Sequence, residues 1–488
     1  MFHVKGPVRI VVPAIVGAAL GLWSSGGAVA AATLVQISSD PYTNSTSQHA
    51  TELEPDTLSS GSTMVAAFQV GRFFNGGASN IGFATSTNNG SSWTAGFLPG
   101  TTVFATPAGP YPRASDPSVA FDAKDGVWLI SYLGIKNPSG PVDVLVSRST
   151  DGLTWGNPVV VNATGHFNDK NWTVCDNTAT SPFYGNCYTE FDDNTLGDLM
   201  QMSTSTNGGQ TWGAANATTD RVHGIGGQPL VEPDGAVVVP FDGFSFSQFL
   251  VKVFRSSDGG ASWGPARVIS IDRYHTPAGG IRAGIPLPSA EIDGAGKIYL
   301  AWPDCRFEVA CSANDPVFST TTNGVRWTPV TRIPADAKGG GVDHFIFGLG
   351  VDRSTSGSTG HIALTFYFYP NANCTSSTCE LKAGSTTSAD GGASWTATET
   401  LAGPMSLSLL PNTTQGRMVG DYISTSFSST GKAFPGLAVG MTPTTEAFNE
   451  NMFTISGGLT ASSALGATDQ SNESAGAPST TMSDLTDQ

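Results

Sequence analysis

The chain has 488 residues and a formal net charge of -16 at pH 7, from 39 acidic and 23 basic side chains. Nucleic-acid binders need a basic surface, so this balance argues against that class. Only 13% of the residues are charged, while glycine occurs 59 times, which excludes a coiled coil or a long-helix protein. With 39% hydrophobic and 9% aromatic residues, the chain can bury a large core. This composition favours a secreted all-β protein.

The beginning of the chain has the pattern of an export signal. Lys5 and Arg9 precede an apolar run at 10–23, and small residues end in Ala-Val-Ala at 28–30. This is the order of a cleavable signal peptide. A membrane anchor is the weaker alternative, because the run is short and interrupted by glycine and proline, whereas hydrocarbon is about 30 Å thick. We expect residues 1–30 to be removed and the mature protein to be secreted, extracellular and free of the membrane.

A repeated turn sequence organises the rest of the chain. The string SSDGGASW at 256–263 recurs as SADGGASW at 388–395, and four looser copies occur elsewhere. The six copies, spaced by about 60 residues, end at Trp93, Trp155, Trp212, Trp263, Trp327 and Trp395. Asp or Asn at the third position can accept hydrogen bonds from backbone N–H groups further along the turn. Glycine allows positive φ, and the tryptophan buries its ring. Each copy therefore predicts a hairpin turn in a β-sheet.

These strings match the Asp-box, or BNR, motif S-x-D-x-G-x-T-W, and the chain resembles the sialidase-like β-propeller superfamily over residues 34–456. The resemblance implies an all-β propeller of four-stranded antiparallel blades, with the repeated turns on the blade periphery. Seven units favour seven blades, and six is the alternative. Leu34–Ile37 is expected to pair with the last unit and close the ring. We thus expect a signal peptide at 1–30, a propeller at 31–456 and a disordered Ser/Thr/Ala/Gly-rich tail at 457–488.

The six cysteines lie in three close pairs, namely Cys175 with Cys187, Cys305 with Cys311, and Cys374 with Cys379. Local pairing costs the least loop entropy, and export permits disulfides, so three local bridges are expected. The spacings do not fit zinc, and no cofactor is expected. The string Asp192-Asp193-Asn194 offers oxygen ligands for a structural calcium ion, although a solvated turn is the favoured interpretation.

Polar residues recur where the innermost strand of each unit is expected to begin. Six units carry an aspartate later in that strand, at Asp56, Asp122, Asp176, Asp234, Asp293 and Asp352. The polar residues at or near the strand starts include Asp116, Lys170, Gln228, Arg282, His344, Asp421 and Tyr422. Charges are costly to bury, so this set predicts a ligand site at one axial face. For each single residue, strand capping or a tie between blades is the alternative.

The resemblance implies a glycan-active enzyme, and an exo-acting glycoside hydrolase of the sialidase type is favoured. The arginines that would hold a substrate carboxylate are Arg113, Arg282 and Arg417. Tyr422 would be the nucleophile, with Glu291 as its base and Asp116 as the acid/base. Lys170, Gln228, His344 and Asp421 are expected to bind the glycan. The F/Y-R-I-P motif of the family is absent, and the strings around Arg72 and Arg282 do not match it.

Two alternatives therefore stay open. A polysaccharide lyase acting on a uronate-containing glycan would use His275 or His344 as the base, with Arg282 or Lys170 neutralising the carboxylate. A non-catalytic propeller would bind a glycan or a protein. Trp128, Trp172 and Trp302 lie outside the repeats and the signal, in strand-like runs where core packing is expected. A monomer with a glycan as its only partner is favoured.

Overall fold

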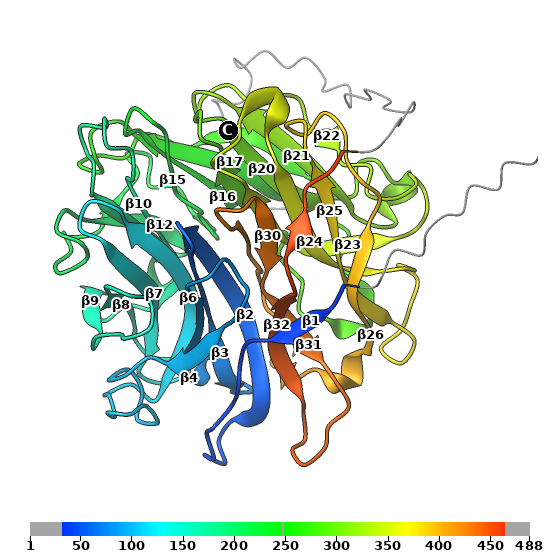
Figure 1. Cartoon of the computed structure of the whole chain (residues 1–488), viewed down its shortest axis with the longest axis horizontal. Coiled ribbons are helices and arrows are strands. Elements are labelled where there is room, and N and C mark those ends of the chain that lie inside the picture. The colour runs from blue at the N-terminus through cyan, green and yellow to red at the C-terminus, as the bar shows by residue number, and fades with distance from the viewer. Residues whose placement is uncertain (1–31, 246–247, 464–488) are drawn as a thin grey trace, which may run out of the picture. The chain divides into compact units, whose positions relative to one another are not determined.

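The structure, a computed structural model, describes residues 32–245 and 248–463. Within these ranges the chain forms β-strands and five short 3-10 helices, with no α-helix. The predicted signal peptide lies outside the described residues. The all-β prediction is confirmed for the described part (Figure 1).

Antiparallel strands pair in groups that mostly contain four strands. The first three groups are β2 (Gln48–Ser60), β3 (Thr63–Arg72), β4 (Ala78–Ser86) and β5 (Thr94–Phe97), then β6 (Arg113–Asp122), β7 (Val127–Ile135), β8 (Val142–Ser149) and β9 (Val159–Asn162), then β10 (Asn168–Cys175), β11 (Cys187–Asp193), β12 (Leu199–Ser205) and β13 (Asn216–Ala217). The 3-10 helix η1 (Asn194–Leu196) follows β11.

The next three groups follow the same order. They are β14 (Gly224–Ile225), β15 (Leu230–Val231), β16 (Val237–Ser245), β17 (Gln248–Ser256) and β18 (Arg267–Asp272), then β19 (Ser289–Ile292), β20 (Ile298–Asp304), β21 (Asp315–Thr321) and β22 (Thr331–Arg332), then β23 (Asp343–Val351), β24 (Ile362–Tyr369), β25 (Glu380–Ser388) and β26 (Glu399–Ser406). The remaining 3-10 helices are η2 (Ala278–Gly280), η3 (Val309–Cys311), η4 (Gly357–Thr359) and η5 (Leu407–Leu409).

The last group is built from both ends of the described chain. Its strands are β29 (Thr425–Phe427), β30 (Lys432–Pro435), β31 (Leu437–Gly440), β32 (Glu450–Ile455) and β1 (Leu34–Gln36), with β33 (Leu459–Thr460) paired to β30. A separate hairpin is formed by β27 (Asn412–Thr413) and β28 (Gly416–Arg417).

The first strands of the groups, which we call the inner strands, pack on one another in chain order. β2 contacts β6, β6 contacts β10, β10 contacts β15, β15 contacts β19, β19 contacts β23, β23 contacts β29, and β29 contacts β2. Hydrophobic clusters lie between neighbouring groups, so strands such as β7 and β24 are buried along their whole length. Burial on both faces explains their near-continuous apolar sequences. The arrangement is consistent with propeller blades.

The N-terminal strand completes the last group. Leu34, Val35 and Gln36 in β1 lie opposite Ile455, Thr454 and Phe453 in β32. The backbone N–H of Ile37 also donates to the carbonyl of Met452 at 2.8 Å. The predicted pairing of residues 34–37 with the last unit is confirmed, and it covers an edge of β32 that would otherwise be open.

The folded part continues past the boundary expected at residue 456. β33 pairs with β30, so that Leu459 lies opposite Ala433. Thr387 donates a side-chain hydrogen bond to the carbonyl of Ser462 at 3.2 Å, and Ser463 accepts one from the N–H of Ala389 at 3.1 Å. The expected start of a disordered tail at 457 is therefore corrected, because the described chain stays paired to its neighbours. Residues 464–488 of the expected tail lie outside the described residues.

The repeated turns have the hydrogen bonds expected from their sequence. In the turn at 256–263, Asp258 Oδ1 accepts from the N–H of Ser262 at 3.0 Å, and Ser256 Oγ accepts from the N–H of Gly260 at 3.0 Å. Gly260 has a φ of +82°, and a Cβ there would lie 2.4 Å from Thr204 Oγ1. The Trp263 ring is 1% exposed. The turn is thus held by its own polar atoms and anchored in the core.

Three disulfide bridges form as predicted, Cys175–Cys187, Cys305–Cys311 and Cys374–Cys379. The first joins the end of β10 to the start of β11. Among the described residues, the structure contains no helix of sufficient length and hydrophobicity to span a membrane.

Candidate functional site

Four inner strands carry the same backbone irregularity near their starts. Their ladders shift register around Ala50, Asp116, Lys170 and Ile346. These residues have φ angles of 52°, 50°, 45° and 55°. Each is the sixth residue before the repeat aspartate of its unit. A non-glycine residue with such a φ angle costs about 1–3 kcal/mol. A β-bulge also turns side chains away from the regular ladder. Backbone strain is therefore stored at Asp116 and Lys170.

A cleft of about 300 Å³ lies where two of these strands, β6 and β10, begin. Its charged lining consists of Arg72, Asp116, Asp169, Lys170, Arg282 and Asp421. Its larger apolar side chains include Phe167, Ile225, Ile285 and Leu287. Arg72 ends β3, Asp116 lies in β6, Asp169 and Lys170 lie in β10, and the other two charges come from the segments after η2 and before β29. The fold therefore gathers side chains that are distant in the sequence.

A bidentate ion pair crosses the cleft. Arg282 Nε donates to Asp421 Oδ1 at 2.8 Å, and Arg282 Nη2 donates to Asp421 Oδ2. Burial opposes the charge on Arg282, but the acidic surroundings, with Asp421 as the largest contributor, outweigh burial and raise its pKa. Arg72 lies beside this pair and donates to Gln69 Oε1 at 2.7 Å, while burial and the charge of Arg282 lower its pKa. The two guanidinium groups thus share one acidic environment.

Two carboxyl groups next to Asp116 favour their protonated forms. Burial, followed by repulsion from Asp116, raises the pKa of Asp169 to about 7. The same two causes raise the pKa of Glu54 well above its ordinary value, with a further contribution from Asp421. A carboxyl group that titrates near neutral pH can give up a proton to a leaving group. The cleft therefore contains a carboxyl group suited to general-acid chemistry beside a second carboxylate.

Lys170, which lines the cleft, lies against the rings of Tyr422 and Trp172. The Lys170 ammonium lies 3.6 Å from the centre of the Tyr422 ring and 4.8 Å from that of the Trp172 ring. The Tyr422 hydroxyl donates to the carbonyl of Pro117 at 2.9 Å. Burial, then the charges of Glu54 and Asp116, raise the Tyr422 pKa well above its ordinary value. The Tyr422 phenol, which was expected to be the nucleophile, is therefore neutral, and its hydroxyl is hydrogen-bonded to the backbone.

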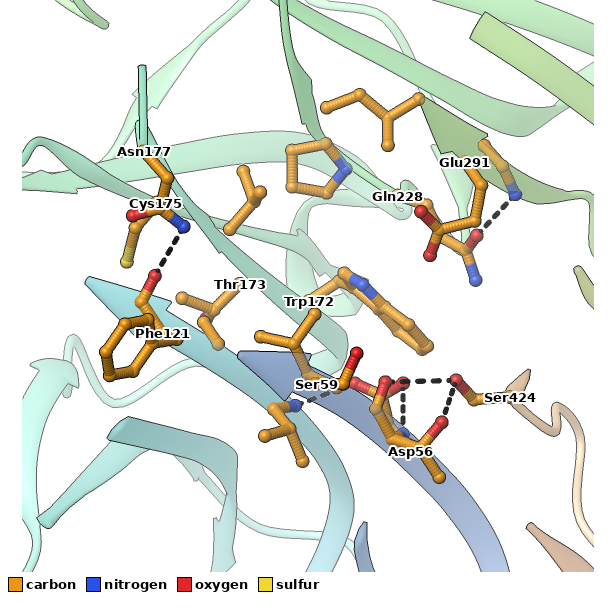
Figure 2. A pocket seen from close by; sticks show the side chains of 18 of the residues that line it. Asp56, Ser59, Phe121, Trp172, Thr173, Cys175, Asn177, Gln228, Glu291 and Ser424 are labelled. Carbon is orange, nitrogen blue, oxygen red and sulfur yellow. Dashed lines mark hydrogen bonds between the residues drawn. The ribbon is translucent and has the colours of Figure 1, made fainter. Parts of the chain in front are cut away.

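A second cavity, of about 230 Å³, follows the inner strands and is lined by residues from β2, β6, β10, β15, β19 and β23 and from the segment before β29 (Figure 2). Glu291 and Gln228 lie here, and within the described chain neither is part of the cleft lining. Glu291 pairs with Arg353, with Oε2 and Nη2 3.6 Å apart. Gln228 Oε1 accepts from the N–H of Ala290 at 2.7 Å. The structure does not place Glu291 as a hydrogen-bond partner of Tyr422.

The expected three-arginine clamp is not assembled. Arg113 lies over the Phe73 ring at 4.1 Å and donates to Asn75 Oδ1 at 2.7 Å. Arg417 donates to the carbonyl of Leu410 at 2.7 Å. Of the three, Arg282 alone is part of the described cleft lining. Its neighbour there is Arg72, for which the sequence predicts no role.

His344 lies in the core and not at the mouth, because β23 turns its side chain inward. It is 0% exposed and packs against Phe366 and Phe368. Its Nδ1 lies 3.0 Å from the carbonyl oxygen of Asn314, and burial lowers its pKa to about 4. The substrate-binding role expected for this histidine is therefore corrected. The other candidate base, His275, pairs with Asp343 at 3.0 Å.

The remaining expectations concern tryptophans and calcium. Trp128 and Trp302 are buried in the core as expected, but Trp172 lines the second cavity (Figure 2). Asp192 and Asp193 are buried in β11, so the expected solvated turn is wrong. Within residues 32–245 and 248–463, no group of three or more His, Cys, Asp and Glu side chains is arranged to hold a metal ion.

No family model and no curated protein sequence matches the chain. Solved structures similar to it include a protein of unknown function from Dyadobacter fermentans, with 14% identity and a TM-score of 0.45 over 72% of this chain and 98% of that one. A Hadza microbial sialidase has 13% identity and a TM-score of 0.45 over 87% of this chain and 93% of that one. A polysaccharide lyase, an ulvan lyase, has 12% identity and a TM-score of 0.49 over 87% of this chain and 96% of that one.

Proposed function

We propose that the chain is a secreted seven-bladed β-propeller that hydrolyses glycosidic bonds in the cleft at the starts of its inner strands. The seven inner strands contact one another in a series that returns to its first member, and β1 joins the last group. These contacts support seven blades. The signal-like N-terminus and the three disulfides support export.

The proximity of Asp116 to Asp169 in the cleft is the observation that carries the enzymatic proposal. Glycoside hydrolases use one carboxylic acid to protonate the departing oxygen and one carboxylate at the anomeric carbon. Asp169 has a pKa of about 7 and is only partly buried, so it can hold a proton at neutral pH and reach a ligand. Asp116 lies close enough to repel its charge. We assign Asp169 as the general acid and Asp116 as the group that stabilises the positive charge developing on the sugar. Water attacks the anomeric carbon after the alcohol departs, and its proton returns to Asp169.

The strained bulges give this pair a fixed geometry. Asp116 lies at the bulge of β6, with a φ of 50°. Asp169 precedes the bulge residue Lys170, and its Oδ1 accepts a hydrogen bond from the Lys170 N–H at 3.0 Å. Lys170 is held in turn by the Tyr422 and Trp172 rings. Catalytic groups are effective when surrounding structure holds them in place before the substrate arrives. The acid and its partner therefore need little rearrangement on substrate binding.

The test is hydrolysis of a glycoside panel by the mature chain from residue 31. We expect at least one member to release sugar, and Asp116→Asn or Asp169→Asn to slow release by about 100-fold or more. Asp234→Asn is the matched control, because Asp234 is an exposed repeat aspartate whose turn hydrogen bond to Ala236 an asparagine oxygen can keep. An unsaturated, ultraviolet-absorbing product would refute hydrolysis in favour of elimination. Glycan binding with no product from any substrate would refute catalysis.

A further inference from the structure

The three cations of the cleft already have partners. Arg72 is 3% exposed and Lys170 is 4% exposed, and they contact Gln69 and two aromatic rings, respectively. The Arg282 side chain is 18% exposed, and both of its bonds go to Asp421, whose side chain is 27% exposed. A ligand entering the cleft therefore meets a carboxylate more readily than a guanidinium group.

The rest of the accessible lining is neutral. Asn75, Thr414 and Gln415 are exposed and supply amide and hydroxyl groups, while Ile285 is 41% exposed and supplies apolar surface. Sugar hydroxyls donate well to carboxylate and amide oxygens. The C–H face of a sugar ring can pack on aliphatic side chains, because burying apolar area is favourable. These groups suit a polyhydroxylated ring without a charge.

An anionic sugar meets two obstacles in the same place. Its carboxylate or sulfate would compete with Asp421 for Arg282, since that guanidinium already makes a bidentate pair. It would also lie beside the displaced Asp421 carboxylate and near Asp116, and like charges at short range repel. Protonation of Asp169 and Glu54 reduces this repulsion but releases no further cation.

We infer that the cleft selects uncharged sugar residues and discriminates against those that carry a carboxylate or a sulfate. This inference rests on the proposed function, which gives the position of the site. The evidence for the selectivity is that the three cations of the cleft already have partners within the protein. Asp421 is the residue that sets the selectivity, because it occupies the most accessible cation of the cleft.

The test compares binding of neutral and acidic sugars at pH 7. Methyl galactoside, methyl glucoside and methyl arabinoside are titrated against N-acetylneuraminic acid, glucuronic acid and glucose 6-sulfate by calorimetry, and matched fluorogenic glycosides are assayed for release. We expect at least one neutral sugar to bind at least tenfold more tightly than any acidic one. Asp421→Asn frees Arg282 and should reduce that preference by at least threefold, whereas Asp234→Asn should leave it unchanged.

The outcomes separate this inference from the proposed hydrolysis. An acidic sugar that binds as tightly as every neutral one overturns the selectivity, even if the enzyme is active. Neutral sugars that bind without being hydrolysed support the selectivity and overturn the hydrolase. An unchanged preference in folded Asp421→Asn protein overturns the role of Asp421. Absence of binding by all the sugars overturns both the site and its selectivity.

Discussion

Replacing Asp169 by asparagine should remove the alkaline limb of the pH–rate profile. Burial and Asp116 raise the pKa of this carboxyl group to about 7. The general acid must be protonated, so activity is retained below pH 7 and falls as pH rises through that value. Asp169 is about 90% protonated one unit below its pKa and about 10% protonated one unit above it. We therefore expect kcat/KM of the native enzyme to fall about tenfold for each pH unit well above 7.

The loss of activity should depend on the leaving group. An alkyl glycoside needs a proton on its departing oxygen, so Asp169→Asn should slow its hydrolysis by about 100- to 10,000-fold. A 2,4-dinitrophenyl glycoside departs as a stable anion, so the same variant should lose much less activity with it. Initial rates of both substrates are measured from pH 4 to 9 for the native protein and the variant.

Two results would refute this assignment. One is an alkaline limb that persists in Asp169→Asn with the alkyl glycoside, because the titrating acid would then be another group. The other is an equal loss with both substrates, which would indicate damage to binding or folding. Circular dichroism of the variant distinguishes misfolding from a loss of proton transfer.

The fold gives three further predictions. Asp258→Ala removes the acceptor for the Ser262 N–H, and the free energy of unfolding should fall by about 1–2 kcal/mol in urea titrations. Burial raises the pKa of Glu52 to about 8, so the folded state keeps a proton that the unfolded state releases, and the free energy of unfolding should fall as pH rises from about 5 to 8. Replacing Cys175 and Cys187 together by serine should lower the free energy of unfolding by about 3 kcal/mol, because their bridge closes a loop with a sequence separation of 12.

Each of these has a control. Glu446 is exposed, so Glu446→Ala should leave the urea midpoint unchanged. If Asp258→Ala also left the midpoint unchanged, the hydrogen bond of Asp258 in its turn would not stabilise the fold. Glu52→Gln should flatten the pH dependence of stability, and a native protein that becomes more stable from pH 5 to 8 would contradict the assigned direction. A double-serine variant as stable as the native protein would exclude a stabilising role for the Cys175–Cys187 bridge.

The sequence by itself determined the features that depend on local order and repetition. A turn such as 256–263 contains its own donors and acceptors, so its hydrogen bonds follow from the string. Cys175 and Cys187 are close in the chain, so their pairing follows from loop entropy. Counting along each unit also located Asp116 and Lys170, because equivalent positions of a structural repeat adopt equivalent backbone conformations.

The tertiary structure alone decided how the cleft side chains contact one another. Counting strand starts grouped Arg282 with Asp421, but it did not indicate their ion pair, and no spacing in the chain indicates that Arg72, at the end of β3, lies beside them. The sequence likewise could not show that Tyr422 donates to Pro117, or that β23 turns His344 into the core. These contacts join residues from different strands, and their geometry depends on how the sheets pack. Periodicity encodes the scaffold because each unit repeats, whereas the site is formed by positions where the units differ.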